Sequence, residues 1–231
     1  MEIVKRWGKP ILIEMWDERF FYFAMKYEWN FIDALEKASG MVTDQFDVEN
    51  AERYGITFMD EDGQKKYPVI LHLSPTGAIE RVIYALLEKA WMEEKNHDKA
   101  PMLPVWLSPE QVRILPVADR HLEFAEKVAE KLEKEGVRVG VDDRSLSIPK
   151  KVFQAKMMWI PYIIVVGDKE MGSEKLPVVV REKSKSKEDY MEDMTVDELI
   201  SKIKEEVGDK PQAPMPLPKH MSKRPIFYGK K

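Results

Sequence analysis

The sequence of 231 residues contains no cysteine and only four histidines. It therefore cannot form a disulfide or a thiolate metal site, and imidazole ligands are scarce. No apolar run approaches the about 18 residues of a membrane-spanning helix. The first ten residues, MEIVKRWGKP, lack the apolar stretch of a signal peptide. These absences fit a cytoplasmic protein without membrane contact, which is the location we expect.

An excess of charge of one sign is also missing. The chain has 37 basic and 41 acidic residues, and its formal net charge is −4. The chain therefore has no overall basic character that would indicate nucleic-acid binding. Any RNA contact must then come from a local patch, because charge is felt over a Debye length of roughly 8–10 Å. The 44% of hydrophobic residues are enough for a core, and the length fits one large or two small domains.

The stretch from Pro68 to Glu88 predicts a strand, a turn and a helix. Residues 68–73 form a short apolar run, as in a buried strand, and Thr76 is a candidate helix N-cap. Apolar residues then recur at helical spacing, at Ile79, Val82, Ile83, Leu86 and Leu87. Glu80 and Arg81 fall in the first turns, where helix N–H groups and a guanidinium can hold a phosphate. The alternative is an ordinary surface Glu-Arg pair.

The residues before this stretch predict antiparallel strands. We expect these strands over residues 11–13, 20–32 and 42–48. Because side chains alternate along a strand, Thr43, Gln45 and Asp47 share one face. From there they can either converge on a small polar ligand or face solvent. Asp60 to Gly63 is a hairpin signal before the next strand.

The second half predicts a separate α/β domain over residues 101–208, after a polar linker that contains prolines. Strands are expected over residues 111–117, 137–141, 162–166 and 176–181, and helices over 118–135, 148–158 and from the capping box that opens at Thr195. This alternation predicts a mixed sheet of about five strands with three helices. Residues 209–231 predict an extended proline-rich tail, with docking of residues 225–228 left open. His97, His121 and His220 are expected at the surface.

Four short motifs, taken in order, resemble the class II aminoacyl-tRNA synthetases, and most closely the archaeal type of threonyl-tRNA synthetase. The resemblance covers essentially the whole chain; each motif alone is weak, but the ordered set is specific. The motifs are the strand Lys26-Tyr27-Glu28-Trp29, the strand Thr43-Asp44-Gln45-Phe46-Asp47, the motif 3 sequence Gly77-Ala78-Ile79-Glu80-Arg81, and Gly167-Asp168-Lys169-Glu170 of the anticodon-binding domain.

The resemblance implies an α/β chain, α+β overall. Residues 1–100 would form the end of a truncated antiparallel class II catalytic sheet with its motif 3 helix. Residues 101–208 would form a mixed five-stranded anticodon-binding domain. Motifs 1 and 2 have no match here, so we expect a C-terminal portion of a threonine–tRNA ligase. Such a chain would bind threonine tRNA but would not activate threonine by itself, and the homodimer of the family stays open because motif 1 forms it.

The same resemblance implies roles for individual residues in the first half. Catalytic roles would belong to Lys26, Thr43, Gln45 and Arg81, of which the first three lie near threonine. ATP, with its Mg²⁺, would be bound by Gly77, Glu80 and Arg81. His72 stands where the family has a Zn²⁺ ligand. The other two ligands, a cysteine and a histidine, have no counterpart here, and one imidazole does not make a zinc site. A hydrogen-bonded or exposed His72 is the default interpretation.

For the second half, the resemblance implies that Ser145, Glu170 and Arg181 read anticodon bases, with Arg144 and Phe153 as further contacts. Edge hydrogen bonds and stacking are how proteins recognise unpaired bases, and these side chains suit both. Phe153 replaces an arginine of the family pattern, so it either stacks on a base or marks weaker reading. Ordinary surface charge is the alternative for Glu170 and Arg181. Lys150 and Lys151 are candidate phosphate contacts.

Two other functions remain open on the sequence alone. One is a non-catalytic module, derived from a synthetase, that binds tRNA or a protein partner. The other is a synthetase for a different amino acid that shares the second domain. The combination of Lys26, Thr43, Gln45 and His72 favours threonine.

Overall fold

The computed structural model describes residues 2–75 and 77–225 of the chain. Thr76, the expected N-cap, and residues 226–228 of the expected docking segment lie outside these residues. The chain divides into two compact units, unit 1 (Met1–Ala85) and unit 2 (Leu86–Lys231). This division falls inside a long helix, α3 (Ile79–His97), whereas the sequence suggested a linker near residue 100.

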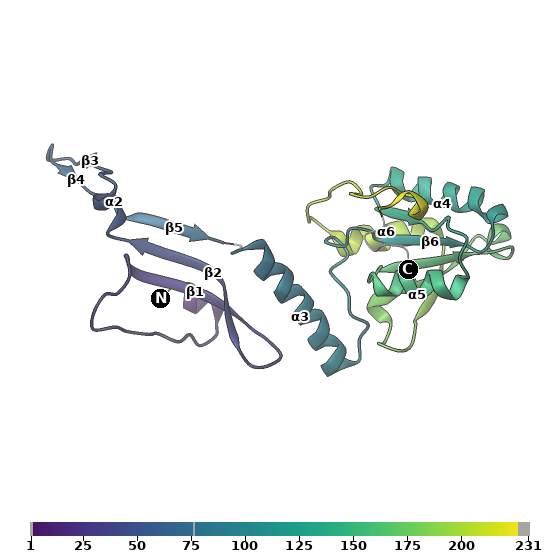
Figure 1. Cartoon of the computed structure of the whole chain (residues 1–231), viewed down its shortest axis with the longest axis horizontal. Helices are drawn as coiled ribbons and strands as arrows, with labels where there is room; N and C mark the ends of the chain where they lie inside the picture. Colours follow the sequence, from purple (N-terminus) through teal and green to yellow (C-terminus); the bar gives the residue numbers. More distant parts are fainter. Residues whose placement is uncertain (1, 76, 226–231) are drawn as a thin grey trace. The chain divides into compact units, whose positions relative to one another are not determined.

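Unit 1 contains a three-stranded antiparallel sheet, in the order β1-β2-β5 (Figure 1). Its strands are β1 (Phe23–Ile32), β2 (Ala38–Asp47) and β5 (Ile70–Ser74). Between β2 and β5 lie the short helix α2 (Asn50–Arg53) and a small hairpin of β3 (Phe58–Met59) and β4 (Lys65–Lys66). The strand motifs therefore fall on β1 and β2 of this sheet, as predicted. The hairpin signal at residues 60–63 marks the turn between β3 and β4, which form a separate two-stranded sheet rather than pairing with the next long strand.

The expected strand at residues 11–13 is absent from the part of the chain that the structure describes. The N-terminal residues instead form helix α1 (Glu2–Trp7), and residues 10–16 have no regular structure. Leu12 is 87% exposed, and no strand among the described residues lies alongside it. An apolar triplet supplies β propensity, but a strand also needs a partner for its backbone hydrogen bonds.

The sheet of unit 1 is open to solvent, which corrects the expectation of a buried strand at residues 68–73. Leu71 and Leu73 of β5 are 56% and 66% exposed. Among the described residues of this unit, only Asp47 and Ala51 are buried. The apolar run does form a strand, but burial requires a second layer over the sheet, and the described residues of unit 1 supply none.

Unit 2 is a three-layer α/β domain around a mixed sheet in the order β10-β9-β8-β6-β7. Strands β6 (Val112–Pro116), β7 (Val139–Val141) and β8 (Tyr162–Val166) are parallel to each other; β9 (Leu176–Val180) and β10 (Met191–Met194) are antiparallel to their neighbours. Helices α4 (Leu122–Lys134) and α6 (Val196–Val207) pack on one face, and α5 (Ile148–Met157) packs on the other. The prediction of five strands and three helices is confirmed, although the sequence did not locate β10.

Two local signals explain helix boundaries in this domain. The Thr195 hydroxyl accepts a hydrogen bond from the Glu198 N–H, and the Glu198 carboxylate accepts one from the Thr195 N–H. This is the expected capping box of α6. Pro149 sits in the first turn of α5, where its missing N–H leaves no helical hydrogen bond unmade.

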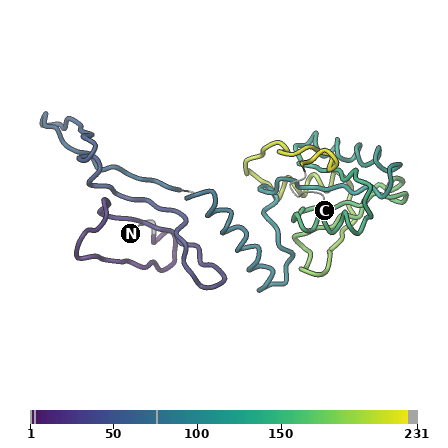
Figure 2. Tube along the Cα trace, in the orientation of Figure 1, coloured from purple at the N-terminus to yellow at the C-terminus, as the bar shows by residue number. Residues whose placement is uncertain are grey.

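The C-terminal tail, as far as residue 225, packs along unit 2 and has little regular structure apart from the short 3-10 helix Met221–Lys223. Figures 1 and 2 show its yellow trace returning to the domain. Its first anchor is the Arg138 guanidinium, which donates to the Gln212 side chain and to the Ala213 carbonyl.

Among the described residues, the structure contains no helix with the length and apolar character of a membrane span.

Candidate functional site

Strand register in unit 1 places three of the predicted residues in one row. Lys26 of β1 pairs with Gln45 of β2, which pairs with His72 of β5. In the next row, Thr43 lies between Glu28 and Ser74. Directly opposed residues of an antiparallel sheet share a face, so these polar side chains form a two-row patch. Thr43 and Gln45 share a face, as side-chain alternation predicted, and the strand register adds Lys26 and His72 to the same patch.

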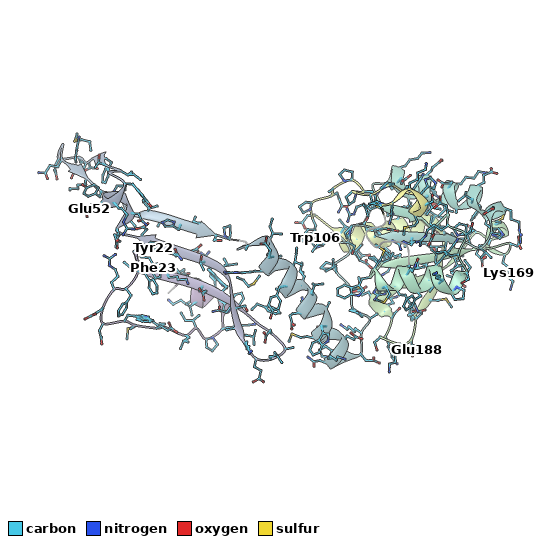
Figure 3. All side chains as sticks on the ribbon, viewed as in Figure 1. Tyr22, Phe23, Glu52, Trp106, Lys169 and Glu188 are labelled. Atoms are coloured by element: carbon cyan, nitrogen blue, oxygen red, sulfur yellow. The ribbon has the colours of Figure 1, made fainter. Side chains whose placement is uncertain are left out.

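The patch is linked by hydrogen bonds. Tyr22 donates its hydroxyl hydrogen to the Gln45 side-chain oxygen, and the Lys26 ammonium forms an ion pair with Glu28. Figure 3 shows Tyr22 and Phe23 where the chain enters β1. Gln45 therefore has its carbonyl end fixed by Tyr22, which leaves its amide group available as a donor.

His72 contacts a buried carboxylate rather than a set of metal ligands. Its Nε2 lies 2.7 Å from Oδ2 of Asp47, whose Oδ1 accepts from the Asn50 and Glu49 N–H groups. Burial alone would raise the pKa of Asp47, but these hydrogen bonds hold it well below its usual range. Within residues 2–75 and 77–225, no three His, Cys, Asp or Glu side chains are close enough to hold a metal ion. These residues do not fit a zinc site.

Among the glycines of unit 1, Gly77 has the least room for a side chain. Its φ is +61°, and a Cβ at this position would lie 2.0 Å from the Met41 carbonyl oxygen of β2. Only glycine combines this dihedral with that proximity. The motif 3 glycine is therefore what lets the start of α3 meet the sheet.

Arg81 projects from the first turn of α3 back onto the sheet. Its Nη1 donates to the Gly40 carbonyl at 2.8 Å. Together with Glu80 and Tyr84 it lines an open hollow of about 430 Å³, completed by Ser39 and Gly40. A guanidinium beside a helix N-terminus is suited to a phosphate group. The helix start after Gly77 thus carries Glu80 and Arg81 to this hollow.

In unit 2, the parallel strands bring two of the predicted base-reading residues to one edge of the sheet. Ser145 follows β7 and Glu170 follows β8, so both lie beyond the carboxyl ends of parallel strands. This edge is where open α/β sheets bind their ligands. Ser145 is exposed, and Figure 3 shows Lys169 projecting from the loop after β8.

The loop after β7 is held by charged side chains. Asp142 is fully buried, and both its carboxylate oxygens accept from the Arg144 guanidinium, at 2.8 and 2.7 Å. This pair raises the pKa of Arg144. The Lys151 ammonium is buried and donates to the Pro116 and Asp142 carbonyls, and burial lowers its pKa. Lys151 is thus unavailable to a phosphate, contrary to expectation, whereas Lys150 is exposed.

The loop after β8 is fixed by a histidine that the sequence alone did not single out. The Nδ1 of His121 accepts from the Ala118 N–H, so its Nε2 carries the hydrogen and donates to Asp168 at 2.9 Å. Arg120 holds the same carboxylate with two further hydrogen bonds, and together these contacts keep the pKa of Asp168 well below its usual range. His121 is 1% exposed, so the expectation of a surface histidine was wrong.

Glu170 closes this loop on itself. Its Oε2 accepts from the Gly167 N–H at 2.8 Å, which leaves Oε1 available at the edge. A side chain at Gly167 would meet this carboxylate at 3.2 Å. The Gly-Asp-Lys-Glu sequence therefore builds a rigid loop that presents one carboxylate oxygen.

Arg181 lies away from this edge. Because β9 runs antiparallel to β8, Arg181 at its end is beside Pro161, at the amino end of β8. Its Nε donates to the Pro101 carbonyl, its side chain is buried, and burial lowers its pKa. It lines a small cavity of about 60 Å³ with Lys156 and Ser184. The structure thus separates Arg181 from the edge that carries Ser145 and Glu170.

Phe153, the candidate for stacking on a base, lies on α5 and its side chain is 62% exposed.

Comparison with known proteins gives close relatives. Residues 111–206 match the family described as anticodon binding domain. The threonine–tRNA ligase of Methanosarcina mazei is 54% identical over 227 residues, which cover 98% of this chain and 35% of that protein. That of Pyrococcus horikoshii is 52% identical over 229 residues, covering 99% and 36%. The chain therefore spans about a third of the length of the curated relatives it matches.

Solved structures agree on the fold. The RNA binding domain of threonyl-tRNA synthetase from Cryptosporidium parvum superposes with a TM-score of 0.66 at 25% identity, over 88% of this chain and 48% of that one. Prolyl-tRNA synthetase of the same organism gives the same TM-score and identity, over 82% and 38%. Sequence and structure together show that this chain is similar to threonine–tRNA ligases over about a third of their length, and that its residues 111–206 match the anticodon binding domain family.

Proposed function

We propose that this chain serves threonine–tRNA ligation and that unit 2 binds the anticodon loop of threonine tRNA. The observation that carries the proposal is the match of residues 111–206 to an anticodon binding domain, within a chain about half identical to threonine–tRNA ligases. The edge formed by the loops after β7 and β8 is the binding surface that we assign.

The chemistry of this edge suits unpaired bases. Ser145 offers a hydroxyl that can donate or accept, and Glu170 offers Oε1 as an acceptor for a base amino group. Phe153 is exposed and can stack on a base.

Cations for the phosphates come from the same loops. Lys150 and Lys169 are both exposed, and neither forms an ion pair within the part of the chain that the structure describes. Arg144, held by Asp142, orders the loop after β7 in this proposal. Arg181 is buried at the opposite end of the sheet and lies outside this surface.

In unit 1 we propose that the polar patch and the hollow beside Arg81 belong to the site of aminoacylation. Lys26, Thr43 and Gln45 would contact threonine, and Arg81 would contact the terminal phosphate of ATP, which reacts as its Mg²⁺ complex. One guanidinium stabilises only part of the charge of a triphosphate. We therefore expect no threonine activation by this chain alone.

The proposal is tested by measuring affinity for threonine tRNA and for a tRNA with another anticodon, beside threonine-dependent ATP–pyrophosphate exchange. We expect selective binding without exchange. Glu170→Gln should weaken threonine tRNA binding about tenfold, as expected for a charge-assisted hydrogen bond. Glu174→Gln, which removes the same charge from an exposed position nearby, should leave the affinity unchanged. Equal affinity for both tRNAs would contradict the proposal.

A module that binds a protein partner is the second candidate. The exposed apolar side chains on the sheet of unit 1, such as Met25, Trp29 and Leu73, favour it. This candidate predicts no tRNA selectivity in the same assay.

A further inference from the structure

We propose that the C-terminal strap, residues 212–224, positions the loop of residues 142–145 for RNA binding, with Ser222 as the positioning residue. The inference rests on the proposed function and deepens it. It starts from the contacts of the strap, which reach the loop that carries Ser145.

The strap follows the free edge of the sheet. In the order β10-β9-β8-β6-β7, strand β7 is an edge strand. The Val141 N–H donates to the Lys219 carbonyl at 3.0 Å, and Val141 forms a parallel bridge with His220. The strap thus satisfies part of an exposed strand edge directly before the loop begins.

Ser222 then binds the loop itself. Its N–H donates to Oδ1 of Asp143 at 2.9 Å, and its hydroxyl donates to Oδ2 at 2.5 Å. Asp142, the residue before Asp143, pairs with Arg144 of the same loop. Of these two adjacent carboxylates, one is therefore held by the loop and the other by the strap. Between them, these contacts fix the residues that precede Ser145, whose own side chain stays exposed.

The strap is anchored independently of this contact. Lys219 forms ion pairs with Glu126 and Glu133 of α4, and the His220 ring contacts Glu126 at 2.6 Å. Beyond Ser222, the buried Arg224 donates to Glu110. Loss of the Ser222 hydroxyl should therefore leave the loop held only by the Ser222 N–H and make it more mobile, without releasing the strap.

A fixed loop favours binding because less conformational entropy is lost when RNA contacts it. Ser145 is exposed while the strap is in place, so the strap orders the loop without covering the residue that we expect to contact a base. The role of Ser222 is positional, since it acts through Asp143.

The test uses the full chain and a threonine tRNA anticodon stem-loop. Ser222→Ala should weaken binding about tenfold and speed amide exchange in residues 142–146, with little change in the melting temperature. Ser222→Thr keeps the hydroxyl and should restore both. Ser201→Ala removes a hydroxyl that donates to the Asp197 carbonyl on α6, away from the loop, so it is the matched control.

A double-mutant cycle separates this contact from other effects. If Ser222 acts through Asp143, Ser222→Ala combined with Asp143→Ala should bind no worse than the weaker-binding single variant. Additive losses would overturn the inference, as would Ser222→Ala with unchanged affinity. If the wild-type chain does not bind the stem-loop, the proposed function and the RNA role of the strap both fail, while the exchange data still report whether the strap orders the loop.

Discussion

At the scale of single residues, Gly77 couples the helix to the sheet through its missing side chain. Gly77→Ala should lower the stability of unit 1 by about 3 kcal/mol or more, because left-handed strain of about 1–2 kcal/mol adds to a clash with the Met41 carbonyl. Gly63→Ala is the matched control, since Gly63 also has a positive φ but has open space around it. The loss of stability in both variants is measured by amide hydrogen exchange in β1, β2 and β5. Equal losses would show that the clash is relieved.

Asp47 gives unit 1 a pH dependence. Its folded-state pKa is depressed, so its contribution to stability is present above the unfolded value of about 4 and is lost as pH falls through the folded value. We expect Asp47→Asn to destabilise unit 1 at pH 7 and to differ less from wild type at pH 3. Urea unfolding followed by amide exchange checks this.

Asp44→Asn provides the comparison for that experiment. Asp44 lies three residues earlier in β2, between Tyr27 and Leu73, and its side chain makes no hydrogen bond or ion pair among the described residues. The substitution should leave the stability of unit 1 the same at both pH values. A pH-independent effect of Asp47→Asn would mean that the carboxylate charge is not what its neighbours stabilise.

Strand alternation predicted which side chains of one strand share a face of the sheet, as Thr43 and Gln45 of β2 do. Lys26 and Gln45 share a row because their strands pair in the register that their polar faces indicate. Alternation does not give strand direction, so the place of Arg181 could not be foreseen: antiparallel β9 carries it to the other edge. Burial of Lys151 likewise depends on two carbonyls from separate segments, which no local pattern encodes.

At the scale of elements, boundaries were predictable where a local signal sets them, as with the capping box of α6. Boundaries were not predictable where a neighbouring strand decides whether the element forms. Strand β10 (Met191–Met194) has the sequence MEDM, which has weak strand propensity, and it forms because β9 offers an edge. Residues 11–13 have strong propensity and no partner strand among the described residues. The strap shows the same dependence, since a proline-rich tail without a core of its own packs on a core already formed.

The strap leads to a prediction about unit 2. Deleting residues 209–231 removes two acceptors of Arg138, the Arg224–Glu110 contact and the bond to β7. Because buried donors are then left unpaired, we expect the free energy of unfolding of unit 2 to fall by about 2–4 kcal/mol. Deleting only residues 226–231 keeps every described strap contact and is the control. Similar urea midpoints for the two deletions would contradict this account.

At the scale of the whole molecule, the two units differ in how they are stabilised. Unit 2 has a continuous core that includes fully buried side chains such as Ile114, Leu132 and Ile164. Unit 1 relies on strand pairing, backbone approaches such as Gly77 and the Asp47 hydrogen bonds, because most of its apolar side chains remain exposed. The chain thus joins a domain with its own core to a sheet that the described residues of unit 1 do not cover.

This difference predicts unequal local stability. Opening of a segment costs less when little apolar surface is buried with it, so amides of β1, β2 and β5 should exchange much faster than those of β6 and β8. We expect at least about a hundredfold difference, corresponding to roughly 3 kcal/mol. Native-state hydrogen exchange at several protein concentrations measures it. Protection of unit 1 that rises with concentration would indicate that a second copy covers its apolar face. Equal protection in both units at low concentration would contradict the conclusion that only unit 2 has a well-packed core.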